Sequence, residues 1–171
     1  IGRPSQLTKR ILIKNNLWLD IGATEWGGGG RWLLTAGGAE DITVEHNTIF
    51  HTGTVLMPAG ASTSPRFIWR NNIASHNLYG VLGESSFVGA RTLAKFFPEY
   101  IYAKNVMINN PYPTWYPPDN FNAASVDAVG FTDIATGNYT LTSSSPYKNA
   151  GTNGTDIGVD MSALNTATVC A

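Results

Sequence analysis

The chain has 171 residues and a formal net charge of −1, and only 13% of its residues are charged, about half of the roughly 25% usual in soluble domains. Eleven Lys and Arg against twelve Asp and Glu leave no basic surplus, which excludes most nucleic-acid-binding proteins. A content of 43% hydrophobic residues can bury a core, which excludes intrinsic disorder, and the length fits one domain.

The ends of the chain carry few further signals. No window approaches the roughly 18 consecutive apolar residues of a membrane span, so no span is expected. Cys170 is the only cysteine, so no disulfide within the chain is expected, and its thiol is either free or paired between chains. The chain begins Ile-Gly-Arg-Pro, without Met or a signal peptide, so we expect it to be a processed or excised piece of something longer.

Four segments of the sequence superimpose without a gap around an Asn. They span residues 11–20, 42–51, 67–76 and 100–109, and their anchors are Asn16, Asn47, Asn72 and Asn105, which are 31, 25 and 33 residues apart. Recurrence at this period is typical of a solenoid.

Each repeated segment predicts two short strands joined by a bend. The residues five and three positions before the Asn are apolar, as in the pair Ile42 and Val44, and a further inward position follows two residues after it. Period-two alternation of β-branched and aromatic residues indicates strands with one buried face. Stacking the copies in parallel about 4.8 Å apart lets each Asn amide bond the next. The expected fold is all-β: a short right-handed parallel β-helix of about four coils.

The stretches between the repeats predict insertions and a tail. Residues 23–38 contain four consecutive glycines and indicate a flexible excursion. Residues 86–99 have helical apolar spacing that ends at Pro98, which predicts one short helix. Residues 111–120 hold four prolines and predict an extended surface loop. We therefore expect coils with insertions over 1–137 and, in the same domain, a capping strand and tail over 138–171 that closes one end of the solenoid.

The sequence resembles the right-handed β-helix proteins of the pectate-lyase-like superfamily, and in particular the C-terminal portion of large secreted β-helix proteins of soil bacteria. The four Asn-centred segments and the ending SPYKNAGTNGTDIGVDMSAL carry this resemblance. It implies the fold and favours activity on polysaccharide. The Arg-x-Pro-x-x-Arg motif of pectate lyases and the Asn-Thr-Asp, Asp-Asp and Gly-His-Gly motifs of polygalacturonases are missing, so no family catalytic residue carries over.

A polar row four residues after each anchor is the candidate catalytic site. It consists of Asp20, His51, His76 and Asn109. Two imidazoles and a carboxylate on neighbouring strands could converge on a divalent metal ion, or an Asp–His pair could act as general acid and base. Alternatively, the position lies at a bend and accepts any stackable polar side chain, as Asn109 suggests.

Two further polar sets have structural and functional interpretations. Lys14, Glu45 and Arg70 alternate in sign two residues before the anchors, which indicates a solvated charge stack. Alternatively, Glu45, His46 and Arg70 could form a lyase base beside cations. In the tail, Asn149, Asn153, Asp156 and Asp160 offer oxygen atoms for calcium, although the intervening glycines are typical of turns.

Aromatic residues in the insertions are the candidate substrate-binding groups, because exposed rings stack on sugars. They are Trp26, Trp32, Tyr112, Trp115 and Tyr116. The alternative is that these loops fold back and bury their rings, whereas Trp18 and Trp69 are assigned to the core.

The sequence thus predicts a secreted or cell-surface, carbohydrate-active protein whose partner is a polysaccharide or glycan, and which is a hydrolase, a lyase or a fragment of one. The alternative is a non-catalytic glycan-binding or structural β-helix module of a larger protein. The first strand pair, near Leu7–Asp20, has no preceding coil, so we also expect a homo-oligomer or a missing N-terminal segment at this open end.

Overall fold

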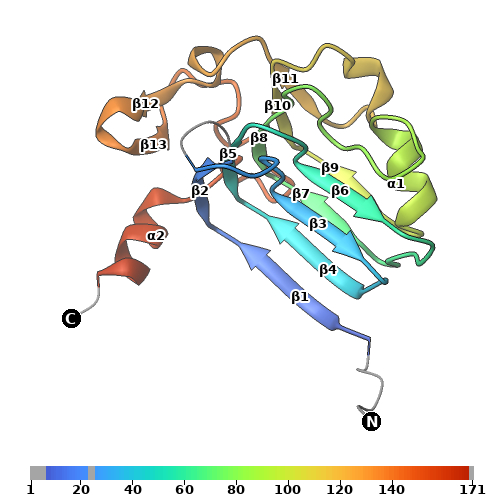
Figure 1. Ribbon diagram of the computed structural model, residues 1–171. Helices are drawn as coiled ribbons and strands as arrows, with labels where there is room; N and C mark the ends of the chain where they lie inside the picture. Colours follow the sequence, from blue (N-terminus) through green and yellow to red (C-terminus); the bar gives the residue numbers. More distant parts are fainter. Residues whose placement is uncertain (1–6, 23–25, 170–171) are drawn as a thin grey trace.

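The computed structural model describes residues 7–22 and 26–169. It is predominantly β, with mostly parallel strands in stacked sheets (Figure 1). The first sheet has the order β1 (Lys9–Lys14), β4 (Glu40–Glu45), β7 (Ile68–Arg70) and β9 (Ile101–Ala103). The second has the order β11 (Phe121–Ala123), β10 (Val106–Ile108), β8 (Ile73–Ser75), β5 (Thr48–His51) and β2 (Leu17–Ile21). The third pairs β3 (Leu33–Ala36) with β6 (Leu56–Ala59).

The strand register confirms the repeat alignment. Ile11 lies opposite Ile42, Val44 opposite Trp69, and Trp69 opposite Tyr102. Each repeated segment therefore adds one strand to the first sheet and one to the second. The all-β prediction is confirmed, and the parallel stacking of like residues is confirmed with it.

The predicted Asn ladder is present and is one rung longer than expected. Asn47 Oδ1 accepts from both the backbone N and Nδ2 of Asn16 at 3.1 and 3.0 Å, and the same pair of bonds links each Asn to the next as far as Asn120. Each side-chain Nδ2 also donates to backbone carbonyls, as that of Asn72 does to Val44 and Arg70, both at 2.9 Å. The ladder satisfies buried polar groups at the bend between the two sheets.

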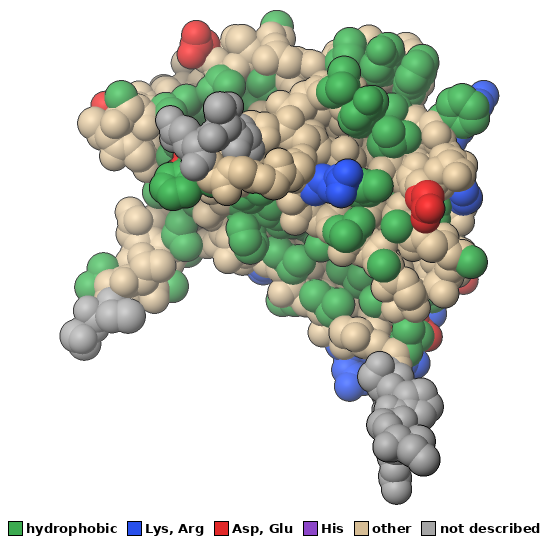
Figure 2. All heavy atoms as spheres, in the orientation of Figure 1, with side chains coloured by type: hydrophobic (Ala, Val, Ile, Leu, Met, Phe, Trp, Pro, Cys, Tyr) green, Lys and Arg blue, Asp and Glu red, His purple; other side chains and the backbone are tan. Residues whose placement is uncertain are grey.

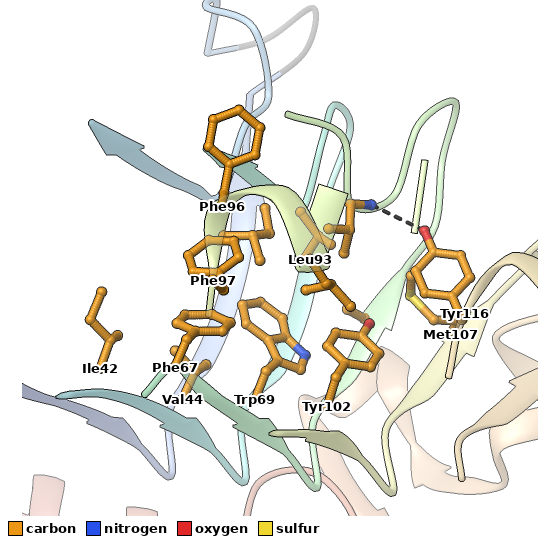
Figure 3. Packing of buried hydrophobic residues seen from close by; sticks show 14 of the residues in the cluster. Ile42, Val44, Phe67, Trp69, Leu93, Phe96, Phe97, Tyr102, Met107 and Tyr116 are labelled. Carbon is orange, nitrogen blue, oxygen red and sulfur yellow. Dashed lines mark hydrogen bonds between the residues drawn. The ribbon is translucent and has the colours of Figure 1, made fainter. Parts of the chain in front are cut away.

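The interior of the stack is an aromatic and aliphatic core. Phe67, Trp69 and Tyr102 project from the first sheet in one row and pack against Leu93 and Phe97 from the α1 segment (Figure 3). Trp69 and Tyr102 are stacked with ring centroids 6.2 Å apart. The helix α1 (Ala90–Phe96) confirms the helix expected within residues 86–99.

A second core lies on the outer face of the second sheet. Ile73, Val106 and Ile108 point away from the interior. They are buried against the segment of the chain that follows β11. That chain contains the antiparallel pair β12 (Phe131–Asp133) and β13 (Asn138–Leu141) and supplies Leu141 and Ile157 to the cluster. This cover explains why β10 is buried at every position.

The tail differs from its expected course and content. It follows the flank that carries the bends: the backbone N of Gly158 donates to Asn71 O at 2.9 Å, and the backbone N of Asp160 donates to Asn15 Oδ1 at 2.7 Å. It then forms a second helix, α2 (Met161–Thr168), whose first turn is capped by the Asp160 carboxylate. The expectation of one short helix is therefore wrong, whereas the strand expected from residue 138 is present as β13. The repeat pattern does not include the flank contacts that hold this segment.

Candidate functional site

Two of the predicted catalytic residues, His51 and His76, lie buried on adjacent strands. His51 ends β5, and His76 follows β8; their exposed fractions are 6% and 0%. His51 Nε2 lies 2.8 Å from Ser75 O, and His76 Nδ1 lies 2.9 Å from Asn77 O. Each imidazole thus donates to a separate backbone carbonyl, and His51 Nδ1 also lies 3.3 Å from Gly30 O.

Asn77 joins the two histidines. Its Nδ2 lies 3.2 Å from His51 Nδ1 and donates to His51 O at 2.7 Å, while its own carbonyl accepts from His76. Asn77 has a positive φ of 52°, a conformation that Asn tolerates better than most residues. Sequence reasoning missed this residue because it lies one position beyond the aligned row.

The third predicted catalytic residue, Asp20, lies outside the row. Strand pairing sets Ile21, not Asp20, opposite His51, with an irregularity between Trp18 and Ile21. Asp20 has a φ of 58° and is exposed. The expected in-register stack of Asp20 on His51 is therefore wrong, because a left-handed residue shifts the strand register at that point.

Burial makes all three histidines poor bases. Burial lowers the pKa of His51 and of His76 below 6.5, and the hydrogen bonds to Ser75 O and Asn77 O only partly oppose it. Burial also lowers the pKa of His46, against the attraction of Glu45. His76 Nε2 is buried without a hydrogen-bond partner within the described residues. The imidazoles are therefore neutral at pH 7.

The aromatic residues of 111–120 divide into a buried and an exposed set. Tyr116 is only 6% exposed, packs edge-on against His76 at 5.8 Å, and accepts a hydrogen bond from Val81 N at 3.1 Å (Figure 3). Gly80 permits this contact, because a Cβ there would lie 2.3 Å from the Tyr116 hydroxyl. Tyr116 is thus a core residue, which contradicts its predicted exposure for substrate binding.

Tyr112 and Trp115 form an exposed stacked pair. Their ring centroids are 4.1 Å apart, their planes differ by 7°, and their exposed fractions are 37% and 48%. A short 3-10 turn over Pro113–Trp115 sets this geometry, because Trp115 N donates to Tyr112 O. Pro113 at the first position of the turn has a fixed φ, which restricts the backbone between the two rings.

An open hollow of about 410 Å³ lies at the segment that precedes Tyr112, and neither Tyr112 nor Trp115 lines it. Its floor and walls combine amides with small apolar side chains: Asn109, Asn110, Pro111, Asn122, Ala123 and Ala124. Asn110 Nδ2 donates to Asn122 Oδ1 at 2.7 Å, and Asn110 Oδ1 accepts from Tyr112 N at 2.9 Å. These bonds connect the amides of the hollow to the backbone of the aromatic pair. The sequence did not indicate Asn110 or Asn122, since neither follows the repeat.

The remaining predicted aromatic residues lie elsewhere. Trp32 is half-buried between Trp18 and Trp69, at centroid distances of 5.5 and 5.4 Å, and so belongs to the interior packing. Trp18, assigned to the core, is 36% exposed. Trp26 is 69% exposed, and no aromatic contact of it is found among the described residues. The predicted aromatic set is therefore dispersed over three locations.

The other polar sets take structural positions. Glu45 receives ion pairs from Lys14 at 3.0 Å and Arg70 at 2.8 Å. Burial raises the pKa of Glu45, but hydrogen bonds from these two cations outweigh it and lower the pKa overall. In the tail, Asp156 pairs with Lys148, and Asp160 caps α2.

Among residues 7–22 and 26–169, no three His, Cys, Asp or Glu side chains are grouped to hold a metal ion. Asp20, His51 and His76, for which the sequence left a shared metal ion open, are not grouped in this way. Cys170 lies outside the described residues.

Comparison with protein-family models, with curated proteins and with solved structures finds no match to this chain. In the described part of the chain, neither helix has the length and apolar character needed to cross a membrane.

Proposed function

We propose that this protein is a right-handed parallel β-helix of about four coils, of the pectate-lyase-like superfamily, and that it serves as a secreted or cell-surface module that binds polysaccharide. The observation that carries this proposal is the exposed, stacked Tyr112–Trp115 pair, whose backbone is hydrogen-bonded to Asn110, one of the amides that line the hollow. The parallel sheets and the Asn ladder support the fold assignment.

The pair and the hollow supply the two kinds of contact that a sugar needs. The apolar face of a pyranose packs on an aromatic face, and its hydroxyl groups exchange hydrogen bonds with amides. Because the two rings are already stacked and exposed, binding requires little ordering of side chains. The neutral amides of Asn109, Asn110 and Asn122 suit an uncharged glycan.

Binding is favoured over catalysis by the state of the polar row. His51 and His76 are buried, neutral and bonded to backbone carbonyls, and Asp20 lies outside their row. A general acid or base must reach the proton that it transfers. The hydrolase or lyase hypothesis keeps one support, which is that the His76 ring lies 6.1 Å from the ring of Tyr112. The catalytic roles of Asp20, His51 and His76 stay predictions.

A polysaccharide panel tests the proposal. Affinity electrophoresis selects a bound glycan, and titration calorimetry then compares Trp115→Ala and Tyr112→Ala with the control Trp26→Ala, which removes the most exposed Trp described. We expect at least a tenfold loss of affinity, about 1.4 kcal/mol, in the first two variants and no loss in the control. Equal losses in all three variants, or no bound glycan, would contradict the proposal.

Product analysis of the same incubations separates the two hypotheses. New reducing ends or unsaturated products that disappear in His76→Ala would assign catalysis to the histidine row. Binding without products, unchanged in His76→Ala, supports the module.

A further inference from the structure

We propose that the edge formed by β1, β2 and β3 is a docking surface for one further polypeptide coil, which adds in parallel and carries acidic residues opposite Lys9 and Lys14 and an Asn next to Asn16. Among residues 7–22 and 26–169, the three strands each pair on one side only, with β4, β5 and β6. Figure 2 shows hydrophobic side chains gathered on the face that carries these strands.

The apolar side chains of the first coil are incompletely buried, which is expected of a surface that contacts another segment. Ile11, Ile13 and Leu33 point toward the interior but are only partly buried, and Trp18 is 36% exposed. Their counterparts one coil further on, such as Val44 and Ile49, are fully buried. Free parallel edges with an apolar interior favour addition of another strand.

The Asn ladder gives the docking surface a direction. Along the stack, each Oδ1 accepts two hydrogen bonds from the Asn of the preceding coil. Asn16 donates to Asn47 in this way, but within the described residues no donor reaches Asn16 Oδ1. Asn16 Oδ1 can therefore accept two hydrogen bonds, one from the backbone N–H and one from the side-chain amide of an incoming Asn.

Charge alternation specifies the flanking residues. Lys14, Glu45 and Arg70 alternate along the stack, and Lys9 pairs with Glu40 at 3.1 Å while Arg66 pairs with Glu40 at 2.9 Å. Both series end on a lysine at the open edge, and the side chains of Lys9 and Lys14 remain about half exposed (46% and 52%). Continuing either series outward favours a carboxylate, because opposite charges on directly opposed residues are stabilising and like charges are destabilising.

A second copy of this chain does not meet the two charge requirements. At the far end of its first sheet, the position equivalent to Lys14 is Ala103 in β9 and the position equivalent to Lys9 is Pro98, which precedes β9, and neither supplies an acid. Two copies joined through their β1 edges would place lysine-bearing strands together. The segment that contains β4 does meet the requirements: Glu40 and Glu45 lie opposite Lys9 and Lys14, and Asn47, which follows β4, is bonded to Asn16. The occupant is therefore a polypeptide coil of the β4 type.

A synthetic peptide with the sequence of residues 38–53 is the probe. It contains no Trp, so the fluorescence of Trp18 and Trp32 reports binding at the open edge. Control peptides carry Glu40→Lys with Glu45→Lys, or Asn47→Ala. We expect saturable binding of the first peptide, at least tenfold tighter than either control and weakened by salt. Equal binding of all three peptides, or no fluorescence change with any, would overturn the proposal.

Protein variants and sedimentation complete the test. Lys14→Gln keeps Arg70 as partner of Glu45 and should reduce the preference for the acidic peptide, whereas Arg91→Gln on α1 should not. An unchanged preference in Lys14→Gln would overturn the proposal. Self-association of the protein alone, with a fluorescence signal that peptide does not alter, would assign the edge to a second copy and also overturn it.

Discussion

The strands β1 and β4 have the same pattern and backbone but different environments. Arg10 and Asp41 have φ values of 59° and 57°, and Asn15 and His46 have values of 55° and 53°. Even so, Ile42 is 3% exposed, whereas its partner Ile11 is only partly buried. Strand geometry is thus set within each coil, but burial requires a neighbour on both sides. The same side chains should therefore contribute unequal stability in the two coils.

The largest expected difference is between ladder positions. Asn72→Ala removes a buried amide that accepts from the backbone N and Nδ2 of Asn47 and donates to the carbonyls of Val44 and Arg70. Each buried donor or acceptor that loses its hydrogen-bond partner costs about 1–3 kcal/mol. We therefore expect the unfolding free energy to fall by about 4 kcal/mol. Asn16→Ala at the open edge should cost about 1 kcal/mol. Urea denaturation measures both, and equal losses would contradict the comparison.

A matched pair of core truncations tests the same difference for apolar burial. Ile42→Ala creates a cavity between two coils and should cost about 3 kcal/mol. Ile11→Ala, its register partner, should cost about 1 kcal/mol, because its neighbourhood can relax and is partly hydrated. The denaturation midpoints measure the difference. If the acidic peptide docks on the edge, the cost of Ile11→Ala should rise in its presence.

The pH dependence of stability should come from the second and third coils, because the histidines lie there. Burial lowers the pKa of His46, His51 and His76 below 6.5. The unfolded chain therefore binds more protons below pH 6.5, and stability is complete above that pH and falls as the pH drops toward the folded pKa. Each histidine that stays neutral in the folded state should lower the unfolding free energy by about 1 kcal/mol as the pH falls from 6.5 to 5.5.

His46→Asn is the matched variant for this effect, since Asn occupies the equivalent positions 15 and 71 with the same positive φ. It should leave stability at pH 7.5 unchanged and remove about 1 kcal/mol of the loss at pH 5.5. An unaltered pH profile would show that His46 is not the titrating group.

The smallest expected effect concerns the charge stack. Glu45→Gln removes a carboxylate that pairs with Lys14 and Arg70 and should cost about 1 kcal/mol at low salt. The control Glu99→Gln alters an exposed acid and should cost nothing measurable. High salt should narrow the difference, and a salt-independent loss would point to packing instead.

The sequence by itself determined the local pattern. The four Asn-centred segments, their alternating apolar positions and the short helix near residue 93 follow from periodicity and residue type, and the strand pairing confirms them. Asn120 was missed because only 15 residues separate it from Asn105, so it does not follow the period. The Tyr112–Trp115 part of the candidate site was indicated by composition, whereas the amides beside it were not.

Only the tertiary structure decided what each position faces. It buried Tyr116 against His76, moved Asp20 out of the histidine row, and placed the tail along the flank from Asn71 to Asn15. Side-chain alternation within a strand is fixed by local backbone geometry. Burial and convergence depend on segments brought together from distant parts of the chain, and no repeat unit contains that information.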